Sequence, residues 1–265
     1  NATYQVQDGM IVGTTQQGGA NTFLCTQRDY DDFILELEYL VDPAMNSGIQ
    51  IRSLSKPDYH NGVVHGYQVE IDPSPRAWSG GIYDESRRGW LYPLKDHPKA
   101  QAAFQQNQWN HYRIEAVGDS IRTWVNGIPA ADLRDSLNLS GFIALQVHGT
   151  NRKEPMQIKW RNIRIQDLGK HRWKPLFNGK NLSGWHALPG GKWEVVDGAI
   201  RGTSEASEPR HGLLVSNQTY DDFTVRASFK VTRGDSGFYF RSEKSGDGVG
   251  VHGFQVEVDT SYETG

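Results

Sequence analysis

The sequence predicts an all-β protein, an antiparallel β-sandwich or jelly roll. Its composition includes 29 glycines, 11 prolines and eight tryptophans, which favours strands joined by tight turns over helices. Apolar and polar residues alternate with a period of two over many short segments, the pattern of strands with one buried face. Many short strands with little helix are typical of a sandwich or jelly roll.

The segments follow one another in chain order. VHGYQVEID (64–72) alternates Tyr67, Val69 and Ile71 with polar residues. HPKAQAAFQQN, which starts at His97, is the one stretch that predicts a helix. The remaining predicted strands are WNHYRIEAVG (109–118) and DSIRTWVNGIPAADL (119–133), which turns at Asn126-Gly127, then GFIALQVHG (141–149) and MQIKWRNIRIQDL (156–168).

Charge and composition exclude several classes of partner. The net charge is -3, so the chain lacks the basic footprint of a nucleic-acid-binding protein. No window approaches the roughly 18 apolar residues of a membrane span. The single cysteine, Cys25, excludes an intrachain disulfide and a cysteine-based metal cluster.

An internal repeat organises the chain, with a shift of about 190 residues between its two copies. YDDFILELEYLV (30–41) matches YDDFTVRASFKV (220–231), and VHGYQVEID matches VHGFQVEVD (251–259). We therefore predict a first domain over 1–169, lacking an N-terminal segment, and the N-terminal half of a second copy over 170–265. Either the chain is a fragment of a longer protein, or something else completes the second copy.

Between the two copies, the face whose residues are unchanged differs from strand to strand. In the YDDF strand the polar face changes, for example from Glu36 to Arg226. In the repeated nonapeptide the polar face is unchanged while the apolar face varies. The unchanged residues are Gln68, Glu70 and Asp72, which correspond to Gln255, Glu257 and Asp259.

An arginine is also unchanged, as Arg52 in one copy and Arg241 in the other. Placed beside two carboxylates, it would keep them ionised and oriented by charge and bidentate hydrogen bonds. The alternative is a structural ion pair between Arg52 and Glu70 that both copies inherited. An isolated surface pair contributes only about 0 to 1 kcal/mol, which favours the functional interpretation.

Glu70 and Asp72 lie two residues apart on one strand, so their side chains project from the same face at about 6 to 7 Å. Two carboxylates in this arrangement can act as a general acid and base, as metal ligands, or as acceptors for sugar hydroxyl groups. The spacing leaves all three open.

Further motifs identify a family resemblance. SGGIYDESRRGWLY (79–92), LFNGKNLSGWH (176–186) and the GYQVEID, WNHYRIEAVG and GFIALQVHG segments occur in the order found in the 3-keto-disaccharide hydrolases. The chain resembles this family over nearly its whole length. The resemblance implies a concanavalin A-like fold, two curved antiparallel sheets with a carbohydrate-binding concave face, here duplicated.

The resemblance also implies an activity on glycosides whose C3 hydroxyl has been oxidised to a ketone. The ketone acidifies the C2 proton, so a base can remove it and the C1 substituent can leave by β-elimination, with water added later. The implied partner is a carbohydrate and the implied location is extracytoplasmic, although no signal peptide is visible. No cofactor is assigned, and a divalent metal ion is one possibility.

The resemblance and the repeat together give a set of candidate residues. Glu70 is the expected base or ligand, Asp72 and His148 complete the catalytic group, and Tyr83 and Trp90 offer a donor and a stacking surface. The expected substrate-binding residues are Arg52, Gln68, Tyr83, Trp90 and Gln146, with Arg241, Gln255, Glu257 and Asp259 in the second copy.

Two features depart from related patterns. Many members of the family read GYEVQILD, with glutamate and glutamine in the reverse order from Gln68 and Glu70. Sandwich glycosidases with an EIDIE-like strand need a third acid, but that position holds Ser74 here, which disfavours a retaining mechanism from this strand. A lectin or non-catalytic carbohydrate-binding module is the alternative function.

Overall fold

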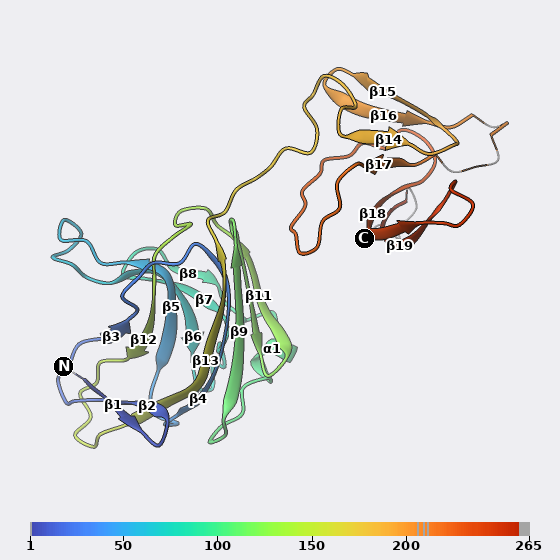
Figure 1. The fold of residues 1–265 in the computed structure, drawn as a ribbon. Coiled ribbons are helices and arrows are strands. Elements are labelled where there is room, and N and C mark those ends of the chain that lie inside the picture. Colours follow the sequence, from blue (N-terminus) through green and yellow to red (C-terminus); the bar gives the residue numbers. More distant parts are fainter. Residues whose placement is uncertain (1, 206, 209, 211, 260–265) are drawn as a thin grey trace. The chain divides into compact units, whose positions relative to one another are not determined.

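The computed structural model describes residues 2–205, 207–208, 210 and 212–259. It divides into two compact units, Asn1–Arg172 and Trp173–Gly265, which are described separately. Figure 1 shows the strands of each unit along the chain.

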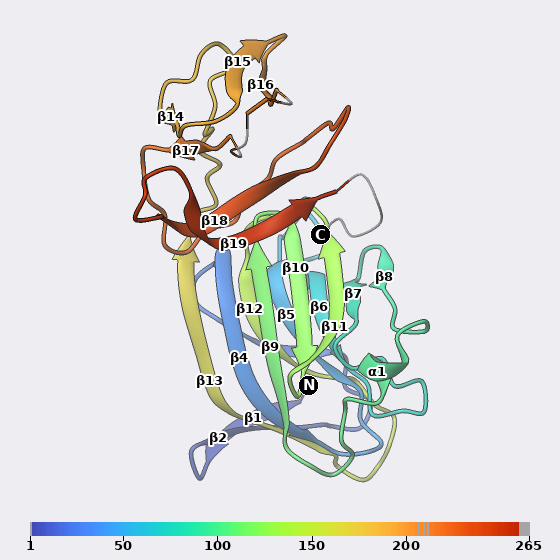
Figure 2. The same ribbon diagram turned by 90° about the vertical axis from the view of Figure 1, so that its right-hand side faces the viewer.

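The first unit is a sandwich of two antiparallel sheets, so the predicted all-β class is confirmed. In the seven-stranded sheet the strands lie in the order β1 (Thr3–Gln7), β2 (Met10–Thr14), β13 (Gln157–Gly169), β4 (Asp32–Val41), β9 (Asn110–Val117), β10 (Ser120–Val125) and β11 (Ile128–Arg134). Figure 2 shows several of these long strands face-on.

The second sheet of this unit has six strands. Their order is β3 (Thr22–Cys25), β12 (Phe142–Val147), β5 (Ser47–Leu54), β6 (His65–Ile71), β7 (Ile82–Glu85) and β8 (Gly89–Tyr92). The helix predicted after His97 is confirmed as the short α1 (Pro98–Gln101), with proline in its first turn. The predicted hairpin is also confirmed, because Asn126 and Gly127 have φ of +50° and +81° between β10 and β11.

The core lies between the two sheets, and the period of two decides which residues enter it. On β4 the side chains of Phe33, Leu35 and Leu37 are buried, and on β6 those of Tyr67 and Val69 are buried. Each fully buried apolar side chain of this size stabilises the fold by about 1.5 to 3 kcal/mol. The alternate residues of β6 therefore face away from this core.

Over its described residues, the second unit forms three two-stranded antiparallel sheets. These pair β14 (Trp185–Ala187) with β17 (Leu214–Ser216), β15 (Lys192–Val196) with β16 (Ala199–Thr203), and β18 (Ser236–Lys244) with β19 (Val251–Val258).

The YDDF segment of the second unit does not form the strand that the sequence predicts. Residues 222–231 have no ladder partner among the described residues, whereas β4 lies between β13 and β9. Phe223 is 42% exposed, while its counterpart Phe33 is fully buried. A strand needs neighbours for its backbone groups, and none of the described residues of the second unit pairs with this segment.

Candidate active site on the six-stranded sheet

The predicted polar face is the face of β6 that points away from the inter-sheet core. Gln68, Glu70 and Asp72 lie there, with their neighbours Tyr67 and Val69 in the core. The three polar residues are nevertheless only 2%, 4% and 2% exposed. Burying three polar side chains costs free energy unless they form hydrogen bonds, and the surrounding residues supply the partners.

The six-stranded sheet curls over this face. Asn21, directly before β3, donates a hydrogen bond of 3.2 Å from Nδ2 to Oε1 of Glu85, the last residue of β7. β3 and β7 lie four places apart in the sheet, so in a flat sheet they would be about 19 Å apart. The contact requires strong curvature, and the acid pair therefore lies on the inner side of the bend.

A chain of amide hydrogen bonds fixes the orientation of Glu70. Ser53 Oγ donates to Gln50 Oε1 (2.6 Å), Gln50 Nε2 donates to Gln68 Oε1 (2.7 Å), and Gln68 Nε2 donates to Glu70 Oε2 (2.8 Å). Gly48 provides the space, since a Cβ there would lie 2.5 Å from the side chain of Gln68. The carboxylate is thus oriented by side chains that are themselves fixed.

The other oxygen of Glu70 faces Asn46 and Arg76. Asn46 Nδ2 donates to Oε1 over 2.6 Å, and Nη2 of Arg76 lies 3.6 Å from the same oxygen. Burial raises the pKa of Glu70 to about 7, against the lowering effect of the two amide hydrogen bonds. A carboxyl group with this pKa can take up and release a proton near neutral pH.

Asp72 shows the opposite behaviour. Burial works against its charge, but hydrogen bonds from Arg76 Nε (2.7 Å) and from the backbone N–H groups of Ser74 and Trp78 (3.2 Å each) outweigh it. Together they hold the pKa of Asp72 below its ordinary value. Two neighbouring carboxyl groups with divergent pKa values are a hallmark of acid–base sites.

Arg76 is a functional candidate that the sequence prediction missed. Its guanidinium carbon lies 4.9 Å from the ring centres of both Trp78 and Trp90, and its side chain is 41% exposed. Trp90 also packs edge-on against Tyr83 at 5.3 Å. Arg76 therefore presents a cation at the surface directly above the two carboxylates, beside the predicted stacking residues.

The prediction that Arg52 lies beside the acid pair is wrong. Its side chain is fully buried, with Nη2 at 2.9 Å from Asp32 Oδ1 and Nε donating to the carbonyl of Asp31 (2.6 Å). The physical reason is a β-bulge: Arg52 has φ of +45°, and the register with β6 shifts between Ile51 and Leu54. The bulge breaks the period of two and turns the arginine away from Glu70.

Arg241 makes the same kind of contact in the second unit. It has φ of +47°, lies 2.8 Å from Asp222 Oδ1, and donates to the carbonyl of Asp221 (3.2 Å). Both arginines therefore form an ion pair, as the alternative interpretation expects. Their partner is an aspartate of the YDDF segment and not the glutamate that the alternative named. The unchanged arginine reflects a shared backbone feature.

Gln146 and His148 lie on the same concave face, at the end of β12. Gln146 stands opposite Gly48 in the ladder and is fully buried, yet neither of its amide atoms has a hydrogen-bond partner among the described residues. A buried amide without a partner is free to hydrogen-bond to a bound molecule. His148 is half-buried, and its Nδ1 lies 2.8 Å from the carbonyl oxygen of Gly149.

The second unit repeats part of this arrangement. Gln255 Nε2 donates to Glu257 Oε2 over 2.6 Å, and Gly237 stands opposite Glu257. Gln255 is exposed, unlike Gln68, and Asp259 follows directly after β19.

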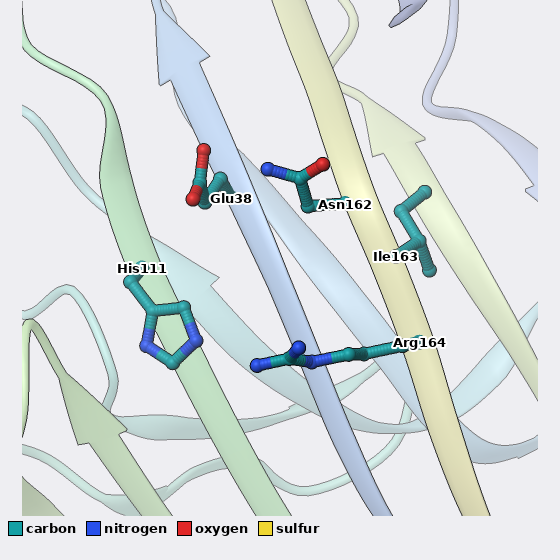
Figure 3. A pocket seen from close by; sticks show the side chains of 5 residues that line it. All are labelled: Glu38, His111, Asn162, Ile163 and Arg164. Atoms are coloured by element: carbon teal, nitrogen blue, oxygen red, sulfur yellow. The ribbon is translucent and has the colours of Figure 1, made fainter. Parts of the chain in front are cut away.

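An open depression lies on the outer face of the other sheet, the seven-stranded one. Figure 3 shows its lining side chains. Glu38 pairs with Arg161 (2.6 Å) and Arg164 pairs with Glu36 (2.7 Å), so its charged groups neutralise one another. The lining residues are Glu38, His111, Asn162, Ile163 and Arg164.

Two features are absent from the described part of the chain, a side-chain cluster for a metal ion and a membrane-spanning helix. No group of three or more histidine, cysteine, aspartate or glutamate side chains there stands close enough to hold a metal ion. The described helices include none long and apolar enough to cross a membrane.

Comparisons with solved structures give weak similarities. A provisionally assigned glycosyl hydrolase from Parabacteroides distasonis ATCC 8503 is 19% identical, with 62% of this chain and 90% of that chain covered and a TM-score of 0.45. The carbohydrate-binding module CBM66 from Bacillus subtilis is 16% identical, with 63% and 92% covered and a TM-score of 0.43. A β-1,3-1,4-glucanase (lichenase) from a mouse hindgut metagenome is 11% identical, with 62% and 83% covered and a TM-score of 0.42.

No curated protein matches the chain. A family match, by contrast, covers residues 1–166 and 172–265, including all of the concave-face residues described above. The family is described as a 3-keto-α-glucoside-1,2-lyase-like domain, which shows a carbohydrate-related function. The chain therefore belongs to the 3-keto-α-glucoside-1,2-lyase-like family.

Proposed function

We propose that this protein cleaves glycosides that carry a ketone at C3. The base removes the proton from C2, the electrons form an enolate, and the bond from C1 to the glycosidic oxygen breaks. Water then adds across the resulting double bond, with hydroxyl at C1 and a proton at C2. The net change is hydrolysis of the glycoside.

One observation carries this proposal: the carboxyl group of Glu70 is buried, is held by two amide groups, and has a raised pKa. A general base works best when its pKa lies near the working pH, and burial raises the pKa of Glu70 to about 7. The amide groups of Gln68 and Asn46 hold both oxygens in place. Glu70 is therefore the group we assign to removal of the C2 proton.

Arg76 supplies the positive charge that an enolate requires. Its guanidinium lies 3.6 Å from Glu70 and is held by Asp72 and two tryptophan rings. A fixed cation beside the base stabilises negative charge as it develops on the C3 oxygen. Trp90 and Tyr83 offer apolar ring faces against which a sugar can stack.

Gln146 and His148 complete the proposed site on the β12 side. The unpartnered amide of Gln146 fits a pair of sugar hydroxyl groups, because an amide can both donate and accept. His148 is the candidate that protonates the leaving oxygen.

The experiment is incubation of the protein with a 3-keto-glucoside bearing a chromogenic aglycone. We expect release by the wild type and a loss of at least about 10²-fold in Glu70→Gln, the typical contribution of a general base. Glu154→Gln, in an exposed loop, is the matched control and should retain full activity. A protein that gains thermal stability with the sugar but releases no aglycone would instead be a carbohydrate-binding module.

A further inference from the structure

Phe23 is an aromatic residue on the concave face, outside the group assigned above. It lies on the edge strand β3, opposite Gln146 in the ladder with β12. Residues that stand opposite each other in a ladder project to the same side, and the flanking Leu145 and Val147 point into the core. Among the described residues, neither the core cluster nor the side chains packed against it include Phe23, whose side chain is half-buried. Its ring therefore lies on the concave side, next to Gln146.

The amide of Gln146 supplies the second half of this arrangement. Its side chain is fully buried, and neither Nε2 nor Oε1 has a hydrogen-bond partner among the described residues. A buried amide that stays unpaired costs free energy, so it adds nothing to the stability of the fold until a molecule binds to it. An aromatic ring beside such an amide suits a ligand with an apolar ring face and a hydroxyl group at its edge.

The chemistry of the elimination decides which part of the substrate reaches this pair. C2 is bonded to C1 and to C3, so the leaving group on C1 and the ketone on C3 extend from C2 in different directions. The ketone oxygen faces Arg76, whose guanidinium contacts Trp78 and Trp90 on the β8 side of the site. The leaving group therefore extends to the other side, across β5 towards β12 and β3.

The register of the sheet places the pair at a suitable distance. Gln146 stands opposite Gly48, and Gly48 stands opposite Glu70, so all three lie in one row across the strands. β12 is two places from β6, which puts Gln146 about 10 Å from Glu70 along this row, with Phe23 one strand farther. A six-membered ring that is joined to C1 through the glycosidic oxygen reaches from Glu70 to this pair.

We propose that Phe23 and Gln146 are specificity-determining residues that hold the leaving group of the substrate. The inference rests on the proposed function and adds to it the side of the site that receives the aglycone. Phe23 contacts the apolar face of a ring in the leaving group. Gln146 forms hydrogen bonds with hydroxyl groups at the edge of that ring.

The first test measures binding without turnover, in a Glu70→Gln background. It compares 3-keto-glucosides with methyl and cyclohexylmethyl aglycones by calorimetry, because both are primary alkyl glycosides and differ only in the ring. We expect the cyclohexylmethyl glycoside to bind at least about 10-fold more tightly, as for a hydrophobic contact of several methylene groups. Phe23→Ala should remove most of this difference, and Phe23→Tyr should keep it.

Leu24→Ala is the matched control, because Leu24 is the next residue of β3 and stands opposite Leu145 on the other side of the sheet. It should preserve the preference for the cyclohexylmethyl glycoside. Equal dissociation constants for the two glycosides, in a protein that binds both, would overturn the role of Phe23 but not the proposed function. A wild type that neither binds nor cleaves any 3-keto-glucoside would overturn the proposed function itself.

The second test replaces Gln146 by methionine, an apolar side chain of similar length. Because the amide is buried without a partner, we expect Gln146→Met to equal or exceed the thermal stability of the wild type. We also expect kcat/KM to fall about 10-fold for a (hydroxycyclohexyl)methyl aglycone and to change little for cyclohexylmethyl. A loss of thermal stability with equal losses of kcat/KM on both glycosides would overturn the role of Gln146, since it would show a purely structural amide.

Discussion

At the scale of the residue, the site depends on a carboxyl group that is buried but not neutralised by a close cation. Arg76 binds Asp72 at 2.7 Å and lies farther from Glu70, at 3.6 Å. The two acids differ because burial dominates at Glu70 and raises its pKa, whereas at Asp72 the hydrogen bonds from Ser74, Arg76 and Trp78 outweigh burial and lower the pKa. A proton acceptor and a fixed negative charge thus lie side by side on one strand.

The raised pKa of Glu70 predicts a dependence of stability on pH. The folded protein binds this proton more tightly than the unfolded chain, whose glutamate has a pKa of 4.5. The contribution is fully present below pH 4.5 and is lost as the pH rises towards and through 7. The free energy of unfolding should therefore fall by about 3 kcal/mol over this window.

Denaturant unfolding at a series of pH values checks this prediction. The difference between wild type and Glu70→Gln isolates the contribution of Glu70 from that of other groups such as Asp72. The wild type should lose stability relative to the variant between about pH 5 and pH 8. Parallel curves for the two proteins would contradict a raised pKa at this position.

Residue-level prediction from sequence succeeded where side chains follow the alternation of a strand. Gln68 and Glu70 share one face, as the period of two requires, because both pair regularly with β5, and Asp72 continues the alternation directly after the strand. Arg76 was beyond this reasoning, since its position depends on the conformation of a loop. Its place four residues after Asp72 was the available signal.

At the scale of the element, the bulge in β5 determines what Arg52 does. The bulge turns Arg52 into a buried pair with Asp32, while the equivalent Asp222 in the second unit has a side chain that is 88% exposed. The same pair of residue types therefore stands in two different dielectric environments. Their energetic contributions should differ accordingly.

Replacement of each arginine by methionine tests this difference. Arg52→Met removes the cation from a buried ion pair, although Asp32 keeps its contacts with the backbone N–H of Gly118 (2.9 Å) and with His171 Nδ1 (2.6 Å), and should cost about 3 to 5 kcal/mol of unfolding free energy. Arg241→Met should cost less than about 1 kcal/mol, as for an exposed pair. Equal costs, measured by denaturant unfolding of the intact chain, would show that the burial of Arg52 has no energetic consequence.

The bulge also explains why sequence comparison misassigned this arginine. An unchanged residue indicates a constraint but not its origin, and the alternation rule placed Arg52 on the face of Gln50. A bulge adds one residue to a strand and is defined by the pairing with its neighbour. That pairing cannot be read from the strand alone.

At the scale of the whole molecule, the same YDDF motif stands in different surroundings in the two units. β4 has partners on both sides, whereas residues 222–231 have none among the described residues. In the second unit Phe229 and Phe254 are each 65% exposed. Whether a YDDF segment forms a strand thus depends on the sheet around it and not on its own sequence.

Hydrogen exchange on the intact chain distinguishes the two segments. Backbone amides of residues 32–41 should exchange slowly, at rates that approach global unfolding of the first unit. Amides of residues 222–231 should exchange rapidly, because they lack ladder hydrogen bonds. Similar slow exchange in both segments would mean that the second YDDF segment is paired in solution.

Sequence alone therefore predicted the fold class well, because alternation, glycine and turn residues agree along the first unit. It predicted a strand at 220–231 from the same alternation, and that prediction was wrong. Propensity supplies only part of the stability of a strand, and neighbouring strands supply the rest.

The central claim is removal of the C2 proton by Glu70, and isotope exchange at C2 tests it most directly. The protein is incubated with a 3-keto-glucoside in D₂O, and NMR locates deuterium in the released sugar, with an enzyme-free sample to measure spontaneous exchange. We predict deuterium at C2 with the wild type and only the spontaneous level with Glu70→Gln. Release of a sugar that keeps its original C2 proton, at the same rate from substrates with hydrogen and with deuterium at C2, would contradict the account.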